Sequence, residues 1–210
     1  MKRILVLHSG GMDSTTCLYK AKAEGAEVFS LGIDYGQRLF VEMLFAKKHC
    51  DALGISREII RLNWHKPERE IPLGRSVKEM SKTVSPAFLP SRNVVLLSLA
   101  CAHGAGLGVD EVHTGITSLE FSGYPDCTPE FFESFKSMIG LANPGGPKVV
   151  APLLMLNKPQ IAQLASEFGI GEFDTWSCYR PQLIDGNIVP CEECDACKLH
   201  HHAWHPTDET

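Results

Sequence analysis

Residues 9 to 14 read Ser-Gly-Gly-Met-Asp-Ser and follow directly on the apolar run of residues 4 to 7. Two glycines allow a tight turn after a buried strand, and the residues that follow predict a helix over Thr15–Glu24. Backbone N–H groups and the hydroxyls of Ser9 and Ser14 would then converge at the N-terminus of that helix, where the helix dipole favours an anion. We therefore expect this loop to bind a phosphate of a nucleotide.

A second group of chemically active residues lies near the C-terminus. Cys191, Cys194 and Cys197 are spaced C-x2-C-x2-C, and Cys178 lies thirteen residues upstream of the first of them. Four thiolates form a closed tetrahedral site that suits structural zinc, although this spacing is also compatible with part of an iron–sulfur cluster. One of the histidines at 200–202 could replace Cys178 as the fourth ligand. We expect four cysteines around Zn2+, because no redox partner motif accompanies them.

The elements that must position these residues alternate along the chain. Short apolar runs predict strands over Arg3–Leu7, Glu27–Ile33, Glu58–Leu62, Glu111–Thr114 and Val149–Ala151. Longer periodic stretches predict helices over Thr15–Glu24, Phe40–Leu53, Asn93–Leu107, Phe131–Ile139 and Lys158–Phe168. This alternation predicts an α/β fold, a parallel sheet flanked by helices. We expect residues 1–172 to form an ATP-binding α/β domain, with a small zinc-binding segment over residues 173–210 packed on it.

Two segments do not follow the alternation. Trp64–Pro90 contains five prolines or glycines and no clear period, and a long irregular segment in a compact domain is often a lid or a binding loop. Gly115–Pro129 lies just past a predicted strand, and ligands of open α/β sheets bind beyond the carboxyl ends of the strands. Both segments are therefore candidates for the wall of a binding site.

Composition restricts the class of protein. The 210 residues carry a net charge of −5 and no basic run, which argues against a broad nucleic-acid surface. No apolar stretch reaches the ~20 residues that span a membrane, and the N-terminal apolar run is too short for a signal peptide. The eight cysteines are not accompanied by other features of a secreted disulfide protein. We expect a cytoplasmic protein.

Five motifs follow one another along the chain: Ser9–Cys17, Asp34–Arg38, Arg92–Asn93, Ser122–Cys127, and Thr175–Tyr179 with the cysteine cluster. In these motifs and their order, the chain resembles the 7-cyano-7-deazaguanine synthase family nearly end to end. Enzymes of this family use a pyrophosphate loop, which cleaves ATP to AMP and pyrophosphate, to make a queuosine precursor.

The resemblance implies an ATP-dependent C–N ligase that converts 7-carboxy-7-deazaguanine and ammonia to the nitrile. It implies Mg2+ as well as ATP and Zn2+, and a homodimer. The implied nucleotide-binding residues are Leu7, His8, Ser9, Gly10, Gly11, Met12, Asp13, Ser14, Thr15, Thr16 and Cys17. The implied catalytic residues are Asp13, Lys158 and Arg92, and the residues implied to read the base are Glu120, Tyr124 and Asp126.

Several positions depart from the family pattern. The family usually has glycine at Ser91 and Glu192, aspartate at Glu120 and arginine at Thr128. Because two of these changes fall in the expected substrate loop, we keep a second hypothesis open. In it, the chain adenylates the same carboxylate but transfers it to another amine, such as a protein N-terminus, and stops at an amide.

Overall fold

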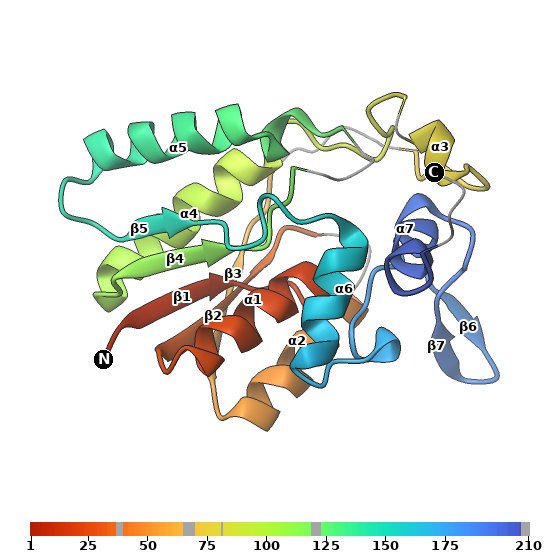
Figure 1. The fold of residues 1–210 in the computed structure, drawn as a ribbon, viewed down its shortest axis with the longest axis horizontal. Helices are drawn as coiled ribbons and strands as arrows, with labels where there is room; N and C mark the ends of the chain where they lie inside the picture. Colours follow the sequence, from red (N-terminus) through yellow and green to blue (C-terminus); the bar gives the residue numbers. More distant parts are fainter. Residues whose placement is uncertain (37–39, 65–69, 81, 119–122, 207–210) are drawn as a thin grey trace.

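Five parallel strands form the central sheet of the protein in the computed structural model, which describes residues 1–36, 40–64, 70–80, 82–118 and 123–206 (Figure 1). The strand order is β3–β2–β1–β4–β5. The strands are β1 (Arg3–Leu7), β2 (Glu27–Asp34), β3 (Ser56–Arg61), β4 (Glu111–Thr114) and β5 (Lys148–Val150). Because the chain winds outward from β1 in both directions, β1 and β4 flank the point where the strand order reverses, which is where such sheets bind ligands.

Helices cover both faces of the sheet. The helices are α1 (Met12–Ala23), α2 (Phe40–Leu53), α3 (Val77–Met80), α4 (Arg92–Leu107), α5 (Pro129–Ala142), α6 (Lys158–Glu167) and α7 (Asp195–Trp204). Figure 1 shows α4 and α5 together on one side of the sheet and α1, α2 and α6 on the other. The structure thus has the helix–sheet–helix layers that the alternating pattern predicts.

The buried strand β1 explains why both layers form. Ile4 and Val6 are fully buried in a core with α1 and α6, whereas Leu5, on the opposite face, packs in the core beneath α4. Alternate side chains of a strand point to opposite faces, so a continuous apolar run fits a strand covered on both sides. The predicted fold class is therefore confirmed.

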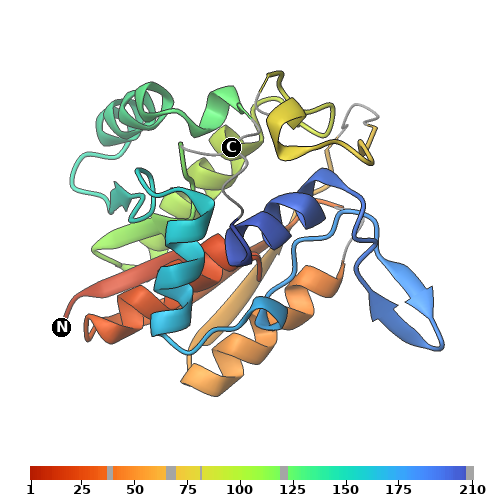
Figure 2. The ribbon, with the colours of Figure 1, turned by 45° about the vertical axis from the view of Figure 1, so that its right-hand side comes forward.

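The C-terminal part adds elements that the sequence analysis did not predict. An antiparallel hairpin of β6 (Gln182–Ile184) and β7 (Asn187–Val189) extends away from the rest of the protein (Figure 2). Helix α7 follows, and it packs on α6 and on the short helix α3. Short 3-10 helices occur at Pro125–Cys127 and Glu172–Asp174.

Several predicted boundaries were wrong by one to three residues; helix α5, for example, covers Pro129–Ala142 rather than Phe131–Ile139. Helix α1 starts at Met12, three residues earlier than predicted, because the helix begins directly after the turn at Gly10 and Gly11. Strand β3 begins at Ser56 rather than Glu58, and β5 covers Lys148–Val150 rather than Val149–Ala151. These two strands lie at the sheet edges, where their extent depends on pairing with β2 and β4 and not on their own sequence.

Among the described residues, none of the helices combines the length and the apolar character needed to cross a membrane.

Candidate active site

A cavity of about 310 Å³ opens at the carboxyl ends of β1, β2 and β4. Leu7, Ile33 and Thr114 line it at or next to those strand ends, and Gly115–Thr117 continues the wall. The volume lies at the lower end of the range for small-molecule sites. Residues from all three predicted site segments contribute: the Ser9–Ser14 loop, the irregular segment before α4 and the segment after β4. The structure thus brings separate parts of the chain to one cavity.

The Ser9–Ser14 loop forms one side of this cavity with its hydroxyls side by side. Ser9 Oγ and Ser14 Oγ are 3.2 Å apart, and the backbone N–H of Ser9 donates to Ser14 Oγ over 3.2 Å. The backbone N–H of Gly11 donates to Ser9 Oγ over 3.3 Å, and α1 begins at the next residue without a side-chain cap. The geometry is the anion-binding arrangement of a helix N-terminus.

Gly10 lets this loop approach helix α2 closely. Its φ is +106°, a region that favours glycine, and a Cβ atom there would lie 2.0 Å from the carbonyl oxygen of Glu42 and 2.8 Å from the backbone N of Ala46. A second close approach is made by Gly115, where a Cβ would lie 2.8 Å from the backbone N of Ser14. The loop is therefore held between α2 and the end of β4 by backbone packing.

Part of the predicted nucleotide-binding set lies behind the loop instead of facing the cavity. Thr15, Thr16 and Cys17 are fully buried. Thr16 Oγ1 donates to the carbonyl oxygen of Met12 over 2.8 Å, and Cys17 Sγ donates to the carbonyl oxygen of Thr114 over 3.6 Å. These residues fix α1 against the sheet.

His8 anchors the base of the loop. It is fully buried, with Nδ1 3.1 Å from Ser30 Oγ and Nε2 3.2 Å from Thr15 Oγ1. Arg57 donates to both Ser30 Oγ and the carbonyl oxygen of His8, over 2.8 and 3.0 Å. Burial, with the nearby Arg57 and His49, holds the pKa of His8 well below its usual range, so the ring is neutral at pH 7.

Asp13 and Lys158 meet at the cavity although 145 residues separate them. Lys158 Nζ donates to Asp13 Oδ2 over 2.6 Å, and their side chains are 12% and 21% exposed, respectively. Lys158 is the first residue of α6, whose start is set by a capping box between Asn157 and Gln160. The cation therefore lies next to the Ser9–Ser14 loop, through its contact with Asp13.

Arg92 begins α4 and lines the same cavity. Burial by itself would lower its pKa, but neighbouring groups raise the pKa above its usual range, and so the guanidinium stays charged. Those groups are Tyr35, Tyr179, Tyr124 and Asp126. A charged, partly buried guanidinium among tyrosines can bind an anionic group of a ligand.

The three predicted base-reading residues have different placements. Tyr124 lines the cavity and packs against Phe88, with ring centroids 5.1 Å apart. Asp126 is 6% exposed, and its Oδ2 accepts a hydrogen bond from the backbone N–H of Asn93 over 3.1 Å, so it holds the start of α4. Glu120 lies outside the described residues.

Besides Asp195, two charged residues of the cavity were not found by sequence reasoning. Glu42, in the first turn of α2, lies next to the loop, and burial raises its pKa although the Ser9 hydroxyl and Arg92 oppose the shift. Arg75 enters from the irregular segment and lies 3.3 Å from Asp195 of α7. No local pattern marks either of them, because each faces the cavity only through tertiary packing.

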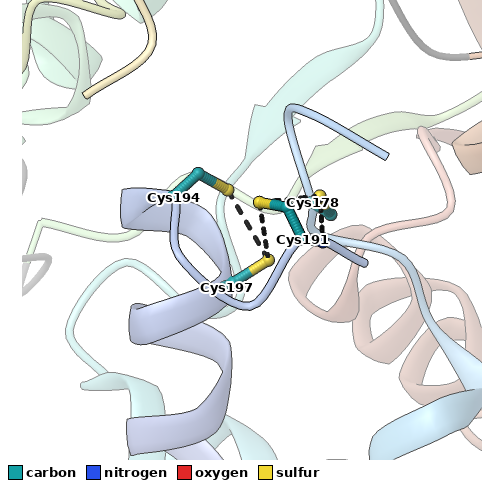
Figure 3. A group of neighbouring side chains, drawn as sticks. All are labelled: Cys178, Cys191, Cys194 and Cys197. Carbon is teal, nitrogen blue, oxygen red and sulfur yellow. Dashed lines mark hydrogen bonds between the residues drawn. The ribbon is translucent and has the colours of Figure 1, made fainter. Parts of the chain in front are cut away.

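The four cysteines form a compact cluster (Figure 3). Their sulfur atoms lie within 4.8 Å of one another; the shorter separations are 3.5 Å for Cys194–Cys197, 3.6 Å for Cys178–Cys191 and 4.0 Å for Cys191–Cys197. A tetrahedral ion with Zn–S bonds of about 2.3 Å separates its sulfurs by about 3.8 Å. The cluster therefore fits a single metal ion. Hydrogen bonds from Cys178 and Cys197 lower the pKa of Cys194, which favours a thiolate there.

His200 is not part of this cluster. Its Nδ1 lies 3.1 Å from Ser177 Oγ and its Nε2 lies 2.9 Å from the carbonyl oxygen of Glu172. Because both ring nitrogens have other partners, the alternative in which a histidine at this position replaces Cys178 does not hold. Among the described residues, the only group of three or more potential metal ligands is the four cysteines.

The cysteine cluster lies directly against the cavity. Trp176 to Tyr179 line the cavity, and the backbone N–H of Trp176 donates to the carbonyl oxygen of Gly10 over 3.2 Å. On the other side, Leu73 and Cys194 form a β-bridge, and Ser85 Oγ donates to Asp195 Oδ2 over 3.0 Å. The segment that carries the four cysteines thus supports both the Ser9–Ser14 loop and the irregular segment.

Comparison with known sequences gives a consistent result. The family model described as "Queuosine biosynthesis protein QueC" matches residues 3–208. A protein of Rhodopseudomonas palustris (strain HaA2) named 7-cyano-7-deazaguanine synthase 2 is 62% identical over 203 residues, 97% of each chain. The 7-cyano-7-deazaguanine synthase of Leptospira interrogans serogroup Icterohaemorrhagiae serovar copenhageni (strain Fiocruz L1-130) is 38% identical over 212 residues, 94% of this chain and 84% of that protein.

Solved structures share the fold at low sequence identity. The U34-tRNA thiolase NcsA from Methanococcus maripaludis, solved with its 4Fe–4S cluster, superposes with a TM-score of 0.54 at 14% identity. The match covers 99% of this chain and 65% of the thiolase. A predicted subunit of a tRNA methyltransferase from Methanocaldococcus jannaschii DSM gives a TM-score of 0.50 at 18% identity, over 80% of this chain and 75% of that one.

Proposed function

Because the chain belongs to the family of queuosine biosynthesis protein QueC, we propose that it makes 7-cyano-7-deazaguanine from 7-carboxy-7-deazaguanine, ammonia and ATP. The observation that carries the proposal is the cavity in which a phosphate-binding loop, a lysine–aspartate pair and an arginine meet beside the strand ends. The 62% identity to a synthase of that name, over nearly the whole chain, supports the same reaction.

The chemistry explains why ATP is needed. A carboxylate oxygen is a poor leaving group, so ammonia cannot displace it. Transfer of AMP from ATP to the carboxylate gives an acyl adenylate and pyrophosphate, and ammonia then displaces AMP to leave the amide. A second AMP transfer to the amide oxygen, followed by loss of AMP and protons, gives the nitrile. One site serves both rounds, because each transfers AMP to a carbonyl-type oxygen.

The residues of the cavity contribute in two ways: they position the reacting groups, and they neutralise the charge on the phosphates. Ser9 and Ser14, with the loop backbone, bind the pyrophosphate portion of ATP. Lys158 neutralises charge that builds up on the transferred phosphate, and Asp13 fixes its ammonium group at 2.6 Å. Asp13 would also help to hold Mg2+, which would supply positive charge to the phosphates of ATP.

On the substrate side, we propose roles for Arg92 and Tyr124, which line the cavity, and for Glu120, which lies outside the described residues. Tyr124 stacks on the deazaguanine ring, supported by Phe88. A carboxylate at Glu120 would accept from the N–H edge of a guanine-like ring. Asp126 acts indirectly, because it holds the N-terminus of α4 from which Arg92 extends.

Zinc is the metal that we propose for the four cysteines. Bound zinc would cross-link the segment of residues 178 to 197, and it would supply no redox chemistry. The close spacing of the sulfurs favours one ion, because a four-iron cube would hold its cysteine sulfurs further apart. We propose the same division as in the sequence analysis, an ATP-binding unit of residues 1–172 and a zinc segment of 173–210, in a cytoplasmic enzyme.

The proposed reaction is tested by mass spectrometry of 7-carboxy-7-deazaguanine incubated with the purified protein, ATP, Mg2+ and ammonium. We expect the nitrile, with two AMP released per nitrile. An amide that accumulates, or no turnover with ammonium, would contradict the proposal and favour transfer to another amine.

The exposed hairpin supports the proposal of a homodimer. Leu183 and Ile188 are 74% and 51% exposed, and they pair across the two strands on one face of the hairpin; Ile184, next to Leu183, lies on the other face. An isolated two-stranded hairpin is only marginally stable in water. A second copy of the chain that covers this apolar side would stabilise it.

Replacing both Leu183 and Ile188 by serine is expected to convert the dimer to a monomer. Light scattering coupled to size-exclusion chromatography at micromolar concentration measures the mass. Leu141→Ser, at an 84% exposed position of α5, is the matched control and should leave the dimer intact. A monomeric wild-type protein would contradict the proposal.

A further inference from the structure

Ser177 and His200 are two polar residues of the cavity to which the proposed mechanism assigns no task. Both line the cavity, and each is partly exposed. Ser177 directly precedes Cys178, and His200 belongs to α7. Because both side chains reach the cavity surface, a small ligand can contact them there.

The hydrogen bonds of His200 fix where its ring carries a hydrogen. Its Nε2 lies 2.9 Å from the carbonyl oxygen of Glu172, and a carbonyl oxygen only accepts, so Nε2 is the donor. Burial lowers the pKa of His200, so the ring is neutral at pH 7 and Nδ1 carries no hydrogen. Nδ1 lies 3.1 Å from Ser177 Oγ, and it therefore accepts a hydrogen bond from that hydroxyl.

This pairing turns the Ser177 hydroxyl into an acceptor for the cavity. Its hydrogen points to His200, which is the only hydrogen-bond partner of the hydroxyl among the described residues. A hydroxyl oxygen has two acceptor lone pairs. These lone pairs match a ligand group that carries N–H donors, whereas a phosphate or a carboxylate needs donors from the protein.

Ser177 lies beside the phosphate-binding loop. A Cβ atom at Gly11 would lie 3.5 Å from the carbonyl oxygen of Trp176, which belongs to the peptide bond that leads to Ser177. On the other side, α7 packs on α6, whose first residue is Lys158, and the Lys158 charge contributes to the low pKa of His200. The acceptor therefore lies between the loop and the lysine, where the proposed transfer of AMP takes place.

The reaction offers several N–H donors, and their positions differ. The amino group of adenine lies at the far end of ATP from its phosphates. The Watson–Crick donors of a guanine-like ring lie across the ring from the 7-carboxylate. Ammonia, in contrast, must stand beside the carbon that receives AMP. Ammonia is therefore the donor that the place of Ser177 fits.

We infer that Ser177 Oγ binds the ammonia that attacks the acyl adenylate, and that His200 is a positioning residue that holds this hydroxyl as an acceptor. The inference rests on the proposed function. Ammonia donates one N–H to Ser177 Oγ, which leaves its lone pair for the carbonyl carbon. The C–N bond forms, the C–O bond to AMP breaks, and AMP leaves with that electron pair. The nitrogen then releases one proton to water.

The test compares Ser177→Ala with the wild-type protein in two assays. The first measures exchange of labelled pyrophosphate into ATP with the carboxylate present and ammonium absent, and so reports adenylation alone. The second measures the KM for ammonium in nitrile formation at one fixed pH. We expect this KM to rise about 5- to 15-fold, because one hydrogen bond to ammonia is lost. The exchange should stay near the wild-type rate, which also shows that the variant is folded.

Matched variants make the result specific. Ser177→Thr keeps the hydroxyl and should keep the KM for ammonium. His200→Gln keeps a donor for Glu172 but removes the acceptor at Nδ1, so this KM should rise by less than in Ser177→Ala. The double variant should equal Ser177→Ala alone, because the two residues act through one hydroxyl. Ser137→Ala removes an exposed hydroxyl of α5 outside the cavity lining and should behave as wild type.

Two results would overturn the inference. One is an unchanged KM for ammonium in Ser177→Ala. The other is a loss of pyrophosphate exchange as large as the loss of nitrile formation, because it would place Ser177 in adenylation. A wild-type protein that exchanges pyrophosphate but forms no nitrile from ammonium would instead overturn the proposed function.

Discussion

The Gly10→Ala variant is expected to lose ATP-dependent nitrile formation by more than about 100-fold and to unfold at a lower temperature. A methyl group at this position would lie 2.0 Å from the carbonyl oxygen of Glu42, which belongs to the backbone of α2 and cannot rotate away. The backbone also has a φ of +106°, which strains any residue with a Cβ.

The expected cost of this substitution combines both effects. Overpacking and left-handed strain together cost about 2–4 kcal/mol. The loss of activity has a separate reason, because the loop must move away from α2 and carries Ser9 and Ser14 with it. A displacement of about 1 Å in a positioned group is enough to cost about 100-fold in rate.

The variant is measured by product formation and by thermal unfolding. Gly140→Ala is the matched control, because a Cβ atom there would have no neighbour within 4 Å and the residue lies in helix α5. Alanine at that exposed helical site should stabilise the protein by about 0.5–1 kcal/mol. A Gly10→Ala protein that turns over at the wild-type rate would show that the loop is not packed against α2 as described.

The Cys194→Ser variant is expected to lose the bound metal and most of its activity. Cys194 is fully buried in the cluster, and its backbone pairs with Leu73 of the irregular segment. Loss of one of four thiolates weakens the metal site, and the segment that depends on it then loosens on both sides of the cavity. We expect a loss of ~3 kcal/mol, which lowers Tm by about 6–12 °C.

Elemental analysis of the purified proteins gives the direct readout. The wild-type protein should contain one zinc and no iron per chain, and Cys194→Ser should contain neither. Cys101→Ala is the matched control: this cysteine is buried in α4, away from the cluster, and burial raises its pKa to about 11. Its metal content should stay at the wild-type value. Iron in the wild-type protein would contradict the assignment of zinc.

Two departures from the family pattern have a structural meaning that the sequence did not show. Ser91 and Glu192 stand where the family usually has glycine, and both adopt positive φ angles, 62° and 61°. The chain therefore keeps the left-handed backbone at the start of α4 and inside the cysteine cluster without glycine.

The turn of the β6–β7 hairpin is a local sequence signal that the sequence analysis missed. Asp185 and Gly186 form this two-residue turn, with φ of 49° and 78°.

The parallel α/β sheet, the Ser9–Ser14 loop between a strand and a helix, and the set of four cysteines could all be predicted from the sequence. Each of these depends on short-range features: alternating apolar runs, two glycines between a strand and a helix, and cysteines at fixed spacing. Such features constrain the backbone locally, whatever surrounds them. The role expected for Asp126 shows the limit, because its carboxylate holds the backbone of Asn93 instead of facing the cavity.

How the charged residues of the cavity pair, and that Glu42 and Arg75 join them, depends on tertiary packing. Lys158 meets Asp13 across 145 residues, and Arg75 meets Asp195 only because α3 packs on α7. Glu42 approaches the loop because Gly10 allows close backbone contact with α2. These contacts join elements distant in the chain, and they depend on how the helices pack on the sheet. No residue pattern within a single segment encodes that packing.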